Sequence, residues 1–163
     1  MEKVLEQYKN DFRAETGVEL PSAGVAQIRG KLEHIVFKQN FDINDPDLGS
    51  KLTDVLKRSV GIELDQAEAD IFATMTDALN KCDPVCKKYV FNQSLGRFEL
   101  NSRPEDNCEV VYCALTDLID IVKGYRKNLE AAKDIRKVMF ISESLKSGVD
   151  RGRQAIKQKL GSV

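Results

Sequence analysis

The sequence predicts an all-α protein: a single-domain bundle of five or six helices around one long central helix at about 103–146. Most long segments repeat their apolar residues three and four positions apart, which is the period of a helix buried on one face. With 42% hydrophobic and 31% charged residues, the composition is that of an ordinary globular protein. The 163 residues are enough for one helical domain over 1–163 with a sizeable core.

Two helices are expected before residue 40. The first carries an apolar stripe from Val4 to Phe12 and ends at Gly17, because glycine accepts the left-handed conformation that follows many helices. The second follows Pro21, with Ser22 as its N-cap. Its predicted buried face contains Val25, Ile28, Leu32, Ile35 and Val36.

Capping signals divide the next region into two further helices. Asp45 followed by Pro46 is a typical helix start, and Gly61 predicts the end of that helix. Asp65 and Glu68 have the spacing of a capping box, so a new helix is expected to begin there and to end before Asp83-Pro84. Its predicted apolar face contains Ile71, Phe72, Met75, Leu79 and Cys82.

The longest apolar pattern lies in the second half of the chain. Residues 89–100 are expected to form either a short β-hairpin or an extended loop. Ser102 and Glu105 form another capping box, and the long helix then continues until Ser147-Gly148, which is expected to interrupt it. Its heptad-like seam contains Cys108, Val111, Leu115, Leu118, Val122, Tyr125, Leu129, Ala132 and Met139.

The formal net charge is −1, but the charges are unevenly distributed. Residues 1–122 form an acidic body with 14 basic and 22 acidic residues, and residues 123–163 form a basic C-terminal helical segment with 11 basic and 4 acidic residues. This asymmetry indicates either an anionic partner or docking of the basic segment on the acidic body. The candidate anion- or partner-binding residues are Lys123, Arg126, Lys127, Lys133, Lys137, Arg151, Arg153, Lys157 and Lys159.

Nucleic acid is one anionic partner to consider, because clustered lysines and arginines bind phosphates without sequence preference. Binding to single strands usually adds stacking aromatic residues, and only Tyr125 and Phe140 lie near the basic positions. Glu130 and Asp134 lie among the cations of the long helix, so neighbouring acids are expected to neutralise part of that charge.

No signature of an enzyme is present. The chain has one histidine, His34, which is predicted to be exposed, and no motif pairs it with a nucleophile. Zinc-protease, serine-hydrolase, phosphate-loop and dinucleotide-binding motifs are absent. Asp117 and Asp120 lie one helical turn apart, as in di-iron bundles, but those sites need two Glu-x-x-His pairs. We therefore predict no catalytic residue, no cofactor and no metal.

The four cysteines form two close pairs, Cys82 with Cys86 and Cys108 with Cys113. Three states are open: four free thiols, a disulfide-stapled helical hairpin, or a zinc site. We favour free thiols, because Cys82 and Cys108 lie on apolar stripes where they would act as small core residues. Cys113 lies opposite the seam and is expected to be exposed.

These observations favour a non-enzymatic helical interaction module that binds another protein or its own copy. The alternative is a nucleic-acid-binding protein that acts through the basic C-terminal segment. No apolar run approaches the roughly 20 residues that a membrane span needs, and the N-terminus has no apolar signal segment, so a cytoplasmic location is expected.

Overall fold

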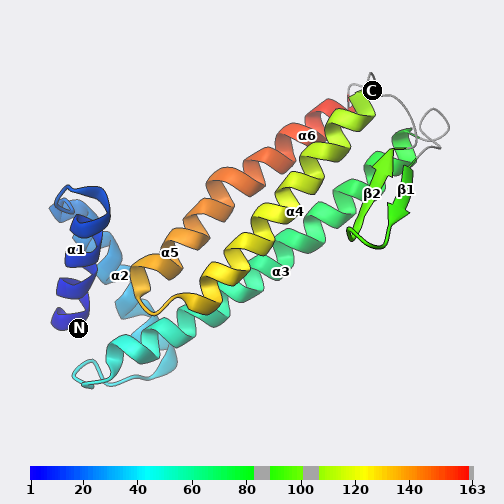
Figure 1. The fold of residues 1–163 in the computed structure, drawn as a ribbon. Helices are drawn as coiled ribbons and strands as arrows, with labels where there is room; N and C mark the ends of the chain where they lie inside the picture. The colour runs from blue at the N-terminus through cyan, green and yellow to red at the C-terminus, as the bar shows by residue number, and fades with distance from the viewer. Residues whose placement is uncertain (83–88, 101–106, 162–163) are drawn as a thin grey trace. The chain divides into compact units, whose positions relative to one another are not determined.

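The structure is a computed structural model that describes residues 1–82, 89–100 and 107–161. The predicted all-α bundle is confirmed (Figure 1). In chain order the elements are α1 (Glu2–Thr16), α2 (Ser22–Gln39), α3 (Leu48–Cys82), β1 (Tyr89–Asn92), β2 (Arg97–Leu100), α4 (Asn107–Ala131), α5 (Ile135–Ser144), the π-helical turn η1 (Leu145–Asp150) and α6 (Arg151–Gly161).

The chain divides into two compact units, which are described separately. The first unit contains Met1–Gly61 and Asn128–Ser142, and the second contains Ile62–Lys127 and Glu143–Val163. The single domain over 1–163, and its division into an acidic body and a basic segment, stay predictions.

Helices α1 and α2 of the first unit lie close to their predicted positions. Gly17 ends α1 in the left-handed conformation, with φ at 72°, and its N–H donates to the carbonyl of Arg13. The N-cap of α2 is Pro21, and Ser22 is already the first helical residue, so the predicted Ser22 cap is wrong. Asn40 then ends α2 in the left-handed conformation.

The core of the first unit joins residues from four helices. Leu32 and Leu52 are fully buried, and Leu48 follows the predicted start at Asp45, whose carboxylate accepts from the N–H of Asp47. The buried cluster consists of Leu5, Tyr8, Ile28, Leu32, Val36, Leu48, Leu52, Ile135 and Met139.

One cation, Arg136, lies buried on α5, with its side chain only 10% exposed. Its guanidinium carbon is 5.0 Å from the ring centre of Phe12 and 5.9 Å from those of Tyr8 and Phe140. Its Nε lies 3.6 Å from a carboxylate oxygen of Glu15. Three aromatic faces and one carboxylate therefore stabilise the buried charge.

Helix α3 is longer than predicted, because it runs through Gly61 without ending. Glycine in a helix interior costs about 0.5–1 kcal/mol, but Val60 and Leu64 on either side are buried. Packing of these apolar residues outweighs the propensity of one glycine. Asp65 and Glu68 consequently lie inside a helix, and their predicted role as a capping box is wrong.

The predicted helix over about 103–146 is two helices, and α3 with its 35 residues is longer than either. Residues 132–134 separate α4 from α5. Asp134 starts α5 by accepting a 2.8 Å hydrogen bond from the N–H of Lys137. The Lys57 ammonium donates to the carbonyls of Glu130 and Ala132, at 3.2 and 3.0 Å. These bonds satisfy carbonyls that a continuing helix would have used.

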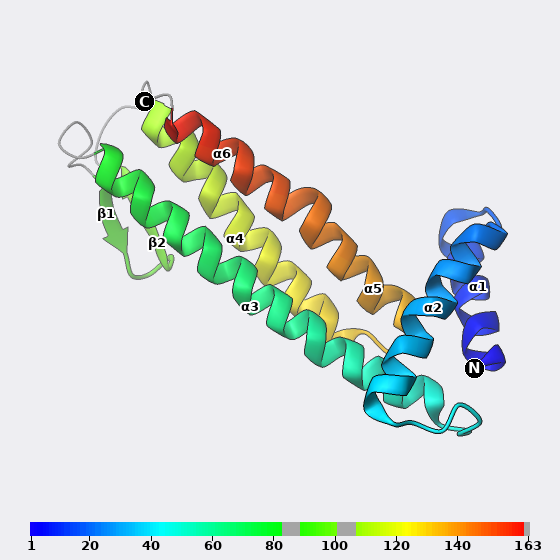
Figure 2. The same cartoon turned by 180° about the vertical axis from the view of Figure 1, so that it is seen from behind.

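The second unit has a core between α3, α4 and α6, which run side by side in both ribbon views (Figures 1 and 2). The expected interruption at Ser147-Gly148 is a π-helical turn, through which the chain stays helical. Burial of Leu118 on the seam is confirmed, as is that of Leu129 in the first unit. Buried residues of the second unit include Leu64, Ala67, Ile71, Met75, Val111, Leu115, Leu118, Ile119, Val122, Val149, Ile156 and Leu160.

Of the two alternatives for residues 89–100, the β-hairpin is confirmed. Strands β1 and β2 pair antiparallel, with Tyr89 opposite Leu100 and Asn92 opposite Arg97. Gly96 in the turn has φ at 63°, a conformation that suits glycine. The capping box at Ser102 and Glu105 lies outside the described residues.

Within residues 1–82, 89–100 and 107–161, no helix is both long and apolar enough to cross a membrane.

Candidate functional site

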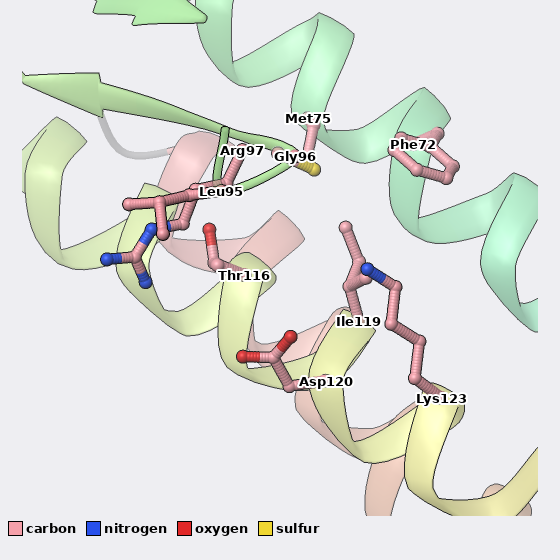
Figure 3. A pocket seen from close by; sticks show the side chains of 9 residues that line it. All are labelled: Phe72, Met75, Leu95, Gly96, Arg97, Thr116, Ile119, Asp120 and Lys123. Atoms are coloured by element: carbon pink, nitrogen blue, oxygen red, sulfur yellow. The ribbon is translucent and has the colours of Figure 1, made fainter. Parts of the chain in front are cut away.

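A cavity of about 180 Å³ opens in the second unit where α3, α4 and the hairpin turn meet (Figure 3). Three separate segments of the chain therefore form its wall. The lining residues are Phe72, Met75, Leu95, Gly96, Arg97, Thr116, Ile119, Asp120 and Lys123. This cavity is called the hairpin pocket below.

Helical spacing explains how α4 supplies one wall of the hairpin pocket. Thr116, Ile119, Asp120 and Lys123 are three or four positions apart, so they lie on neighbouring turns of one face. Thr116 and Ile119 are buried, whereas Asp120 and Lys123 are exposed at the rim. The wall thus has a buried base and a charged edge.

Two large apolar side chains at the mouth of the pocket are exposed to solvent. Phe72 on α3 is 48% exposed and Leu95 in the hairpin turn is 54% exposed, although both are large hydrophobic residues. Met75 and Ile119 are buried below them. Exposed apolar side chains around a cavity are typical of a surface that another molecule covers.

An ion-pair network joins α3 and α4 within two helical turns of Phe72. Arg126 donates to Asp65 at 2.8 Å and to Glu68 at 2.9 Å. The hydrogen bond that Arg126 donates to Asp65, followed by the one it donates to Glu68, raises the pKa of Arg126 above its ordinary value. One arginine thus binds two acids on the turns of α3 that precede Phe72 and compensates one of their two charges.

The charged groups of the pocket itself are not paired in this way. Arg97, Asp120 and Lys123 are exposed, and none of them forms an ion pair within 4 Å with another described residue. Two cations and one acid are therefore available to a ligand at the rim.

The predicted basic residues have different surroundings. Arg126 forms the network above, and Arg153 is largely buried with its Nη2 4.0 Å from a carboxylate oxygen of Asp70. Lys137 pairs with Asp134 at 3.7 Å. Arg126 and Arg153 thus pair with acids of α3, whereas Lys137 pairs with an acid of the basic segment itself. The remaining candidates are exposed: Lys123, Lys127, Lys133, Arg151, Lys157 and Lys159.

Lys133 lies apart from the other exposed candidates, in the first unit. It lines a smaller cavity of about 120 Å³ together with Asp11, Asp134 and Arg136. Two acids and two cations balance there, so this cavity favours neither sign of ligand charge. Of the predicted residues, Lys123 alone lines the hairpin pocket.

The exposed position of His34 is confirmed, and so is that of Cys113. Cys86 lies outside the described residues, and the side chains of Cys82 and Cys108 are not among those described, so the cysteine state stays a prediction. In the described part of the chain, no three metal-binding side chains come together.

Sequence reasoning missed most of the pocket. Phe72 follows Ile71 on the predicted apolar face, but successive helical residues point about 100° apart, which leaves Phe72 half exposed. Leu95 and Arg97 belong to residues 89–100, for which the sequence predicts either a β-hairpin or an extended loop. An apolar residue, Leu95, among turn residues was the signal that could have indicated a contact surface.

The hairpin pocket is small for a ligand site. Ligand sites for drug-sized molecules occupy about 300–1,000 Å³, which exceeds the 180 Å³ present here. An apolar base with charged groups at the rim is instead typical of a pocket for one anchoring side chain. Comparison with known proteins adds no constraint: no family model, no curated protein and no solved structure matches this chain.

Proposed function

We propose that this protein is a non-enzymatic helical interaction module that binds another protein through the hairpin pocket. The observation that carries the proposal is the pair of half-exposed side chains, Phe72 and Leu95, at the mouth of a cavity with a buried apolar base. A cytoplasmic location, where thiols stay reduced, is part of the proposal.

The size of the pocket supports a protein ligand. An apolar cavity of about 150 Å³ can hold a benzene molecule, so the 180 Å³ of the hairpin pocket suit one branched or aromatic side chain. Interfaces commonly obtain most of their binding energy from a few such anchors in pockets. Phe72, Leu95 and Ile119 would surround the anchor, and the charged rim would contact its neighbours.

A selection experiment tests the proposal without a known partner. The immobilised full chain is used to select from a library of random peptides, and selected peptides are measured by fluorescence anisotropy. Phe72→Ser removes the largest half-exposed side chain of the pocket. Phe37→Ser is the matched control, because Phe37 is 86% exposed and belongs to the first unit.

We expect Phe72→Ser to weaken peptide binding at least tenfold, since loss of an anchor contact costs about 2 kcal/mol or more. Phe37→Ser should leave the affinity unchanged, and circular dichroism should report both variants as folded. Failure to select any peptide, or equal binding by both variants, contradicts the proposal.

Binding to a second copy of the chain is the other form of the same function. Size-exclusion chromatography with light scattering measures it directly. A dimer that dissociates in Phe72→Ser but persists in Phe37→Ser would assign the pocket to self-association, whereas a monomer leaves a different protein as the partner.

Nucleic-acid binding is the second candidate, and the exposed cations of the second unit favour it. Lys127, Arg151, Lys157 and Lys159 remain exposed there. If they contact phosphates together, the affinity for fluorescent single-stranded RNA or DNA should fall log-linearly with salt. The variant with all four changed to glutamine should flatten that slope. Absence of binding at low salt would remove this candidate.

A further inference from the structure

We infer that the segment bound in the hairpin pocket is acidic, with carboxylates on both sides of a single bulky apolar side chain. This inference rests on the proposed function and specifies the chemistry of the partner. Charge complementarity between rim and ligand is the basis of the argument.

The cations of the rim outnumber its acids. Arg97 comes from β2 and Lys123 from α4, and among the described lining residues Asp120 is the single acid. Lys127 is exposed one turn beyond Lys123, on the same side of α4. The described residues from the pocket along this side of α4 therefore comprise three cations and one acid, which favours carboxylates in a ligand.

Acids on α3 cancel only part of this charge. Asp65 and Glu68 lie two turns and one turn before Phe72 on α3, and both bind Arg126. One guanidinium compensates only one of these two carboxylates. With this network included, the described residues of the surface comprise four cations and three acids, so a positive excess remains.

The positions of the two cations define where the ligand's acids should lie. Figure 3 shows Lys123 beside Ile119 and Arg97 beyond Leu95, on opposite sides of the pocket. An apolar side chain that enters between Phe72 and Leu95 would thus have a cation on each side. Acids before and after the anchor can contact both.

Two synthetic peptides test this inference. Both contain one central phenylalanine, which is flanked on each side by glutamates in one peptide and by lysines in the other. Binding to the full chain is followed by methyl NMR at Met75 and Ile119, whose signals report occupancy of the pocket even at low affinity. The variant Arg97→Glu with Lys123→Glu reverses the rim charge, and Arg58→Glu with Lys38→Glu is the matched control on exposed residues of the first unit.

We expect the glutamate peptide to bind at least tenfold more tightly than the lysine peptide. Reversal of the rim should exchange the two preferences, whereas the control variant should keep them, because two exposed charge contacts are together worth about a tenfold change. Equal binding of the two peptides, or a preference that rim reversal leaves unchanged, overturns the inference.

The outcomes separate this inference from the proposed function. If library-selected peptides bind in a manner that depends on Phe72 but are neutral or basic, the pocket binds protein and the acidic partner is wrong. If neither synthetic nor selected peptides shift the Met75 and Ile119 signals, both proposals fail. If the glutamate peptide binds equally well to Phe72→Ser, its contact is electrostatic and lies outside the pocket, which also overturns the inference.

Discussion

Replacement of Arg126 by methionine tests the ion-pair network that joins α3 and α4. The change keeps an aliphatic side chain but removes two hydrogen bonds, at 2.8 Å to Asp65 and 2.9 Å to Glu68. The Asp65 side chain is 69% exposed, whereas the Glu68 side chain is 33% exposed. Most of the effect should therefore come from Glu68, whose carboxylate would stay partly desolvated without a partner.

The expected magnitude follows from these exposures. Exposed ion pairs contribute about 0.2–1 kcal/mol each, so the Asp65 pair belongs near the lower limit and the Glu68 pair near the upper limit. We predict that Arg126→Met lowers the free energy of unfolding by about 1 kcal/mol. Urea unfolding measures this loss, and a double-mutant cycle with Glu68→Gln should give a coupling energy of about 0.5–1 kcal/mol.

A loss below about 0.3 kcal/mol, together with no coupling, would refute the reasoning, because the pairs would then be open in solution. The same variant has a second consequence. Loss of the arginine charge adds one uncompensated acid near Phe72, so Arg126→Met should also weaken binding of the glutamate peptide.

Three further predictions concern the fold. Gly61→Ala should stabilise the protein by about 0.5–1 kcal/mol in urea unfolding, because Gly61 lies inside α3 and an added Cβ would meet nothing within 4 Å; destabilisation would indicate that α3 is interrupted there. Leu115→Ala should cost about 2–5 kcal/mol, since Leu115 is fully buried, and a loss below about 1 kcal/mol would contradict its place in the core. The hydrogen bond from Lys51 lowers the pKa of Asp45 below its ordinary value. The stabilisation by this pair should therefore be complete above about pH 4 and be lost as the pH falls through the lowered pKa. The difference in unfolding free energy between wild type and Asp45→Asn should shrink over that range, and a difference that is constant with pH would contradict the assignment.

The end of a helix could be predicted where the apolar stripe stops at a residue that favours a helix end. Gly17 both interrupts the apolar stripe of α1 and takes the left-handed conformation that ends it. At Gly61 the two signals conflict, since buried residues continue on both sides, and packing decides in favour of a continuous α3. The unfavourable helix propensity of one glycine is too small to end a helix whose apolar face is buried.

The break between α4 and α5 could not be predicted from the apolar pattern. The seam continues through Ala132, so periodicity predicts one helix. The break is stabilised by Lys57, which is more than 70 residues away and caps the carbonyls of Glu130 and Ala132. A contact of that sequence separation has no periodic pattern, so a single sequence does not show it.

The candidate site was predicted only in part, because it also depends on contacts between residues that are far apart in the sequence. The basic residues were visible from composition, but the partners of Arg126 and Arg153 on α3 depend on how the helices pack. The hairpin pocket depends on the position of the turn against two helices, which places Leu95 and Arg97 beside Lys123. Only Lys123 belonged to both the predicted set and the pocket.

Methyl NMR of Met75 and Ile119 during titration with a library-selected peptide tests the central claim most directly, because both side chains are buried at the base of the hairpin pocket. We predict saturable shifts of these two signals in the wild type, the same shifts in Phe37→Ser, and no saturable shift in Phe72→Ser. Saturable binding that leaves the Met75 and Ile119 signals unmoved would contradict the claim that the hairpin pocket is the binding site.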